Sequence, residues 1–197
     1  MNPPAVAVQK KTEVHPQDDY RAARPLDSIL LRDMTDAQFK ARYNTDRFTA
    51  SVLASRMRYI VKHMSTGLLT TAFSMILRDW YDFAATISGP RAMNYPMCSG
   101  SDSLSIFIFT MPEGIRNTIE EFGVENLREG DVLITNDPYR AGLHVNDVSF
   151  IRPIFYKGKV VSFVSMRAHQ LDMGGVVAGG FRVQGATPLA NGDFPEQ

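Results

Sequence analysis

The sequence has little cysteine: Cys98 is the single one among 197 residues. One thiol cannot form an intramolecular disulfide, and a thiolate-rich structural zinc site is excluded for the same reason. Cys98 lies in a Ser/Gly-rich stretch without the sequence signature of a nucleophile, so we expect no catalytic role for it.

The sequence also lacks an excess of either charge, because 21 Lys and Arg residues balance 21 Asp and Glu residues. Binding to phosphate backbones normally requires a positive excess, so we expect no nucleic-acid partner. Long apolar runs are missing as well: residues 104–111 and 160–164 fall well short of the roughly 20 residues of a membrane span. Residues 1–11 contain no apolar segment of a signal peptide. We therefore expect a cytoplasmic protein without a membrane partner.

What the chain does contain is enough apolar sequence, 44%, to bury one core. Residues 1–45 begin with a Pro-rich, charged stretch of little periodicity, and we interpret them as an N-terminal extension or arm. From residue 46 apolar residues recur at three- and four-residue steps over about eight turns. This pattern predicts one long helix, or two joined near Gly67, capped at its start by Asp46 or Thr45.

The remaining pattern favours strands. We predict a strand at residues 81–87, a helix beginning near Pro112 and ending at Gly123, and strands at residues 131–135, 148–155 and 159–168. The last two flank Gly158, which can supply the positive φ of a hairpin turn, so they should pair antiparallel. Helices and strands are segregated, and the predicted fold class is α+β, a long N-terminal helix followed by a mainly antiparallel sheet.

Two histidines and a carboxylate should meet at the open end of this hairpin. A three-residue loop, 157–159, pairs Asp147 with His169 on one face of the sheet. A two-residue loop pairs Asp147 with Ala168 instead, and a bulge would then be needed. His144 precedes Asp147 by three residues and should lie beside them.

Imidazole nitrogen and carboxylate oxygen suit Zn²⁺, Mn²⁺ or Fe²⁺ in a site with an open position. The alternative is a structural His–Asp hydrogen bond. Asp137 before Pro138 is a turn starter or a substrate contact. Gly174 and Gly175 either turn the chain or let a substrate approach the backbone.

Several motifs together resemble one protein family, and they cover about residues 48–185. They are Gly130-Asp131-Val132, Thr135-Asn136-Asp137-Pro138-Tyr139, Gly142, His144, Asp147, Arg152-Pro153, Phe155, Arg167-Ala168-His169 and Asp172-Met173-Gly174-Gly175, with Thr71-Ala72-Phe73-Ser74, Ile76, Arg78 and Asp82-Phe83 upstream. The combination is similar to the hydantoinase B/oxoprolinase family. The chain departs from it in having Ala141-Gly142-Leu143-His144 where the family usually has Gly-Gly-Thr-His, and in residues 94–102.

The resemblance implies a divalent metal held by Asp82, His144, Asp147 and His169, the first being the one easily confused with Asp79. We also take Asp137, Asp172, Gly174 and Gly175 as candidate substrate-binding residues. Family subunits are several times longer than the match, so residues 46–197 are expected to be the N-terminal part of a larger domain.

The function that the resemblance implies is activation of a weakly electrophilic carbonyl. The partners would be an A-type subunit that uses ATP, the remaining part of the B-type subunit, and a small carbonyl substrate. The first hypothesis is a subunit of an ATP-dependent cyclic amide hydrolase. The alternatives are a subunit of a ketone carboxylase of the acetone or acetophenone type, and a noncatalytic assembly subunit in which the metal only staples the hairpin.

Overall fold

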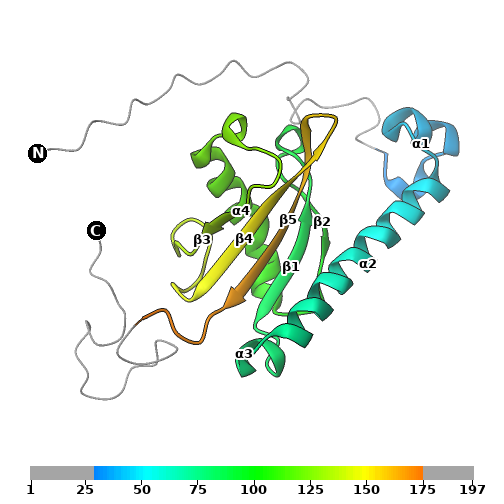
Figure 1. The fold of residues 1–197 in the computed structure, drawn as a ribbon. Coiled ribbons are helices and arrows are strands. Elements are labelled where there is room, and N and C mark those ends of the chain that lie inside the picture. Colours follow the sequence, from blue (N-terminus) through cyan, green and yellow to red (C-terminus); the bar gives the residue numbers. More distant parts are fainter. Residues whose placement is uncertain (1–28, 175–197) are drawn as a thin grey trace, which may run out of the picture.

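The long helix predicted from the apolar periodicity is present in the computed structural model, which describes residues 29–174 (Figure 1). Helix α2 is continuous over Arg47–Thr71, and the short helix α3 follows at Met75–Arg78. Asp46 is confirmed as the N-cap of α2, because its carboxylate accepts a hydrogen bond of 2.8 Å from the amide of Thr49. Gly67 does not interrupt the helix.

A short helical segment precedes α2. It comprises the 3-10 turn Leu31–Asp33 and helix α1, Asp36–Tyr43, which begins with a capping box between Thr35 and Gln38. Arg47 joins the two helices: its Nε atom lies 2.9 Å from Asp36 Oδ1, and its guanidinium lies over the ring of Phe39.

The strands form one five-stranded sheet in which all neighbours are antiparallel. Its order is β2-β1-β5-β4-β3, and its strands are β1 (Phe83–Ser88), β2 (Met97–Gly100), β3 (Leu133–Thr135), β4 (Asp147–Tyr156) and β5 (Lys159–His169). Helix α4 (Ser105–Phe122) and the 3-10 turns Arg91–Met93 and Val124–Asn126 complete the described elements. The predicted α+β class, with a long helix followed by a mainly antiparallel sheet, is confirmed.

The sequence misplaced the starts of two elements and gave no sign of a third. Strand β1 begins at Phe83 rather than residue 81, because Tyr81 has a φ of 57° and cannot continue a strand. The short strand β2 was missed, since four residues with no alternating pattern give no strand signal. Helix α4 begins at Ser105 and contains Pro112. A proline inside a helix removes one hydrogen bond, but here the helix buries an apolar stripe, Phe107, Met111, Ile115 and Ile119, whose burial offsets that cost.

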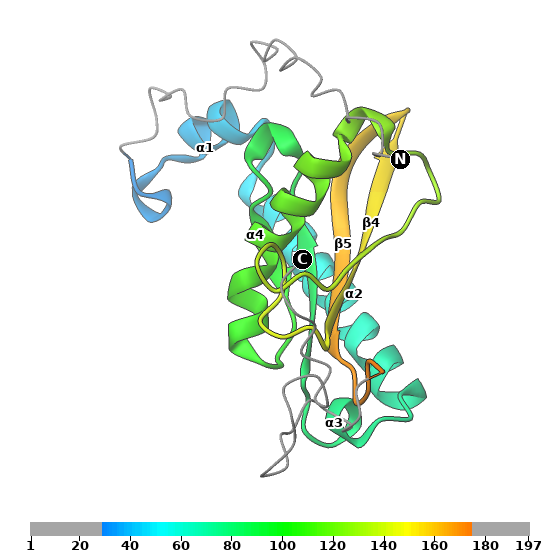
Figure 2. The same ribbon diagram turned by 90° about the vertical axis from the view of Figure 1, so that its left-hand side faces the viewer.

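Helices pack against both faces of the sheet. Helix α4 packs its stripe against Ala84, Ile151 and Phe163 on one face, and Figure 2 shows it standing beside β4 and β5. Helix α2 lies on the other face over β1 and β2, where Val61 contacts Ala85 and Ile87. None of the helices within residues 29–174 combines the length and the apolar character needed to cross a bilayer.

Candidate metal centre

The β4–β5 hairpin sets the register of the predicted site. Tyr156 pairs with Lys159, so the turn has two residues, and both have positive φ, 51° at Lys157 and 75° at Gly158. The register then shifts by one residue between Ile154 and Phe155. The structure therefore has the two-residue loop with a bulge, and the shift makes Asp147 the partner of His169.

The pairing of Asp147 with His169 extends across the sheet to the segment that precedes β1. Phe83 pairs with Ala168, and one step further the amide of His169 donates a hydrogen bond of 3.1 Å to the carbonyl of Asp82. Asp82, His169 and Asp147 thus lie side by side on three adjacent segments. Residues that are directly paired across strands point to the same face, here the face that α4 covers.

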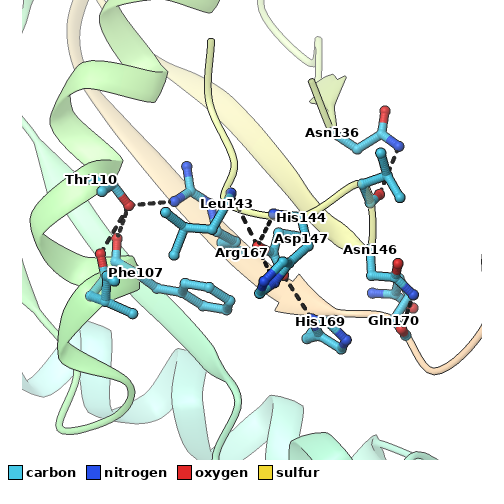
Figure 3. A network of polar contacts seen from close by, with 12 residues as sticks. Phe107, Thr110, Asn136, Leu143, His144, Asn146, Asp147, Arg167, His169 and Gln170 are labelled. Carbon is cyan, nitrogen blue, oxygen red and sulfur yellow. Dashed lines mark hydrogen bonds and ion pairs between the residues drawn. The ribbon is translucent and has the colours of Figure 1, made fainter. Parts of the chain in front are cut away.

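His144, Asp147 and His169 converge on one point (Figure 3). One potential ligand atom from each lies within 4.8 Å of the others. His169 Nδ1 is 2.8 Å from Asp147 Oδ1, and His144 Nδ1 is 3.5 Å from Asp147 Oδ2. Asp147 is 0% exposed, whereas the imidazole of His144 is largely exposed, so the cluster is reached from the side of His144.

Hydrogen bonds fix the loop before β4, which carries His144. The carboxylate of Asp147 reaches back into it and accepts hydrogen bonds from the amides of Leu143 (3.1 Å) and His144 (2.8 Å). Asn146 fixes the other side of the loop to β5, since its side chain donates to the carbonyl of Gln170 and its own carbonyl accepts from the Gln170 amide. Asp147 is thereby held in one orientation before any ion is present.

Asp82, the fourth residue that the resemblance implies as a ligand, follows His169 and Asp147 in the same row of the sheet. Its Oδ1 atom is buried and accepts no hydrogen bond from residues 29–174. Burial raises the pKa of its carboxyl group, an effect that the field of Asp147 reinforces and that His169 and His144 oppose. A buried carboxylate oxygen without a donor is costly, so this position fits a cation. Asp79, by contrast, is exposed and paired with Arg78 at 3.0 Å.

The four residues fit a divalent ion by their chemistry. Two imidazoles and two carboxylates offer nitrogen and oxygen donors, the set that suits Zn²⁺, Mn²⁺ or Fe²⁺. The exposed side of His144 leaves room for a further ligand. The same face of the sheet therefore carries a candidate metal site.

The residues predicted to touch substrate have local contacts of their own. Asp137 accepts from the amide of Tyr139 at 2.9 Å, and its carbonyl accepts from three following amides, contacts that form the turn before His144. Asp172 accepts from the amide of Gly174 in a second turn, where Gly174 has a φ of 94°. Gly175 lies outside the described residues. A substrate role for these four stays a prediction.

Arg167 was missed by the sequence analysis as a site residue. It lies two residues before His169 on β5, on the same face, and is 0% exposed. Its Nε donates to Ser149 Oγ at 2.9 Å, and its Nη1 donates to Thr110 Oγ1 at 2.6 Å. Burial lowers the pKa of Arg167 to about 10, partly opposed by the attraction of Asp147. The available signal was the predicted register, which places a charged residue on the inner face of a central strand.

Helix α4 can approach Arg167 because residue 114 is glycine. A Cβ atom there would lie 2.9 Å from Arg167 Nη2 and 3.0 Å from the Cα atom of Ala141. We expect Gly114→Ala to lower the free energy of unfolding by about 1–3 kcal/mol through overpacking. Gly67→Ala is the matched control: a Cβ in α2 meets nothing within 4 Å, so the helix should gain about 0.5–1 kcal/mol. Urea denaturation of both variants checks this, and a stabilised Gly114→Ala would contradict it.

Known proteins share this sequence and fold. Residues 46–192 match the family model of hydantoinase B/oxoprolinase. The 5-oxoprolinase 1 of Arabidopsis thaliana is 32% identical over 151 residues, 77% of this chain and 12% of that protein. Among solved structures, the nucleotide-free acetone carboxylase has a TM-score of 0.60 at 24% identity, covering 72% of this chain and 18% of that one. The ATP-dependent caprolactamase from Pseudomonas jessenii has a TM-score of 0.62 at 24% identity, covering 70% and 23%.

The described chain is thus a small part of the length of the proteins that it matches, between 12% and 23% for these three. The two solved structures support the fold, and the family match extends over most of the sequence, from the N-cap of α2 through the hairpin and beyond it. The chain therefore belongs to the hydantoinase B/oxoprolinase family.

Proposed function

We propose that this chain provides the divalent-metal site of an ATP-dependent enzyme that activates a carbonyl substrate, a cyclic amide hydrolase of the hydantoinase/oxoprolinase type. The observation that carries the proposal is the convergence of His144, Asp147 and His169 beside the unsatisfied Oδ1 of Asp82. The cyclic amide class is supported by the similarity to a plant 5-oxoprolinase and to the caprolactamase fold.

Each side chain has a distinct task in this proposal. Asp147, held by two loop amides and by His169, fixes the geometry of the site. Asp82 and Asp147 supply the negative charge that a cation requires, and His144 faces the side from which substrate arrives. A divalent ion bound here would act as a Lewis acid on the substrate oxygen or lower the pKa of a bound water. ATP would be used by an A-type partner subunit, and the rest of the B-type subunit would enclose the substrate.

Asp82 gives a sharp test of the metal site. In the complete complex, Asp82→Asn should weaken binding of Mn²⁺ or Zn²⁺ by roughly 100-fold, because a charged oxygen ligand becomes a neutral amide. The metal-free variant should unfold at the same temperature as wild type or higher, since the charge on a carboxylate with one buried, unpartnered oxygen is removed. Metal affinity by calorimetry and thermal unfolding without metal measure the two effects.

Asp79→Asn is the matched control, because Asp79 is a nearby carboxylate with an exposed ion pair. It should change neither metal affinity nor unfolding appreciably. If Asp82→Asn binds the metal as wild type does, Asp82 is not a ligand. If the complete complex binds no divalent ion at all, the proposed function is wrong.

The second candidate is a subunit of a ketone carboxylase, and the likeness to the acetone carboxylase fold favours it. Bicarbonate separates the two reactions, since a carboxylase consumes it and a cyclic amide hydrolase does not. ATP turnover of the complete complex that requires both a ketone and bicarbonate would replace the hydrolase proposal. Turnover that survives removal of the metal would mean that the metal only stabilises the hairpin.

A further inference from the structure

Arg167 carries a buried charge that the proposed ligand set does not use. Its partners within residues 29–174 are neutral: the hydroxyls of Ser149 and Thr110, and the ring of Phe107 at 5.6 Å from the guanidinium carbon. Its Nη2 atom is buried and donates to no group in that part of the chain. A cation of this kind costs more to bury than a neutral side chain of similar size.

The position of Arg167 indicates a function for this buried charge. Arg167 pairs with Ser149 across β4 and β5, and Asp147 pairs with His169, so Arg167 and Asp147 are diagonal neighbours on one face. Diagonal neighbours lie about 7–8 Å apart at Cα, close enough for a field to act and too far for a ligand role. Figure 3 shows the guanidinium between Thr110 and the cluster of His144, Asp147 and His169. Because arginine keeps its proton at neutral pH, this charge is permanent.

The charges of the site can then be counted. Asp82 and Asp147 together carry two negative charges, which balance a divalent cation, and histidines that ligate a metal are neutral. Arg167 is therefore one positive charge in excess. We propose that Arg167 acts on the metal centre through its charge, weakening the hold on the cation and favouring a substrate oxygen that gains negative charge during the reaction. This inference rests on the proposed metal site.

If Arg167 had only a structural role, its replacement would weaken metal binding or leave it unchanged. The proposed charge effect predicts tighter metal binding instead. In the complete complex, the neutral variants Arg167→Gln and Arg167→Met should bind Mn²⁺ about tenfold more tightly than wild type, because a repulsive charge is removed at low effective dielectric. Their turnover should nevertheless fall at saturating Mn²⁺. Calorimetric titration with Mn²⁺ alone and steady-state kinetics give the two readouts, and thermal unfolding confirms that the variants are folded.

Two controls separate charge from contacts. Arg167→Lys keeps the charge and should keep an affinity close to wild type. Thr110→Val removes the hydrogen bond to Nη1 but leaves the charge in place, and should do the same. Weaker or unchanged Mn²⁺ binding in the neutral variants would overturn the proposal, as would failure of both neutral variants to fold. A wild-type complex that binds no Mn²⁺ would overturn the metal site itself, a separate outcome.

Discussion

Replacing His169 with alanine is expected to abolish function in the complete complex while leaving the fold intact. In the proposed site His169 would supply one of two nitrogen ligands, and its Nδ1 atom contacts Asp147 at 2.8 Å. A site with an open position has few ligands to spare, so metal affinity should fall by at least about 100-fold, and turnover with it. Metal content per subunit, thermal unfolding and ATP-coupled turnover measure these effects.

His63 is the control for this experiment. It lies on the exposed side of α2, where its ring is 6.5 Å from that of Tyr59, and it is remote in the sequence from every predicted ligand. His63→Ala should keep metal, stability and turnover. Full turnover in a metal-free His169→Ala complex would mean that the metal has at most a structural role. Undiminished metal binding would mean that His169 is not a ligand.

Replacing Phe163 with alanine is expected to be among the most destabilising single changes in the chain. Phe163 is 0% exposed on the central strand β5, and its ring lies 5.6 Å from that of Tyr95 beneath α4. Truncation leaves a cavity between the sheet and α4, at a cost of about 3–5 kcal/mol. Since whole domains are stable by roughly 5–15 kcal/mol, much of the chain's stability would be lost. Urea denaturation followed by circular dichroism gives the change.

Phe109 provides the matched comparison on α4. Its side chain is 78% exposed in the described structure, so Phe109→Ala should alter the unfolding free energy of this chain by no more than about 0.5 kcal/mol. Similar losses for the two variants would mean that Phe163 does not form part of a closed core.

The sequence predicted the parts of the fold that have a clear periodicity or cap. Asp46 and the apolar repeat after it identified α2, and the residues around Gly158 identified the hairpin. Both signals are local, because a helix cap and a tight turn depend on neighbouring residues. The predicted start of α4 was wrong because Pro112 is a local signal that disfavours the interior of a helix. The burial of Phe107 and Met111, which outweighs this signal, depends on tertiary packing.

The candidate site shows the same division. Counting residues outward from the hairpin turn predicted that His144, Asp147 and His169 lie together. Spacing alone left open whether the loop has two or three residues. Asp82 came only from the resemblance to a family, because no local pattern indicates that β1 lies beside β5. Arg167 could not be assigned a role, because its burial depends on α4 closing over the sheet at Gly114.

The shift of register near Ile154 divides the hairpin into two halves that differ in register. The half near the turn is in one phase, with Tyr156 opposite Lys159, and the half near the metal centre is in the other, with Asp147 opposite His169. The tip of the hairpin can therefore accumulate substitutions without consequence for the site, provided that its length is kept. At unchanged length but without the bulge, the same two-residue turn would pair Asp147 with Ala168, and His169 would face α2, on the wrong side of the sheet. The bulge thus acts as a spacer on which the alignment of the ligands depends, at a distance from any of them.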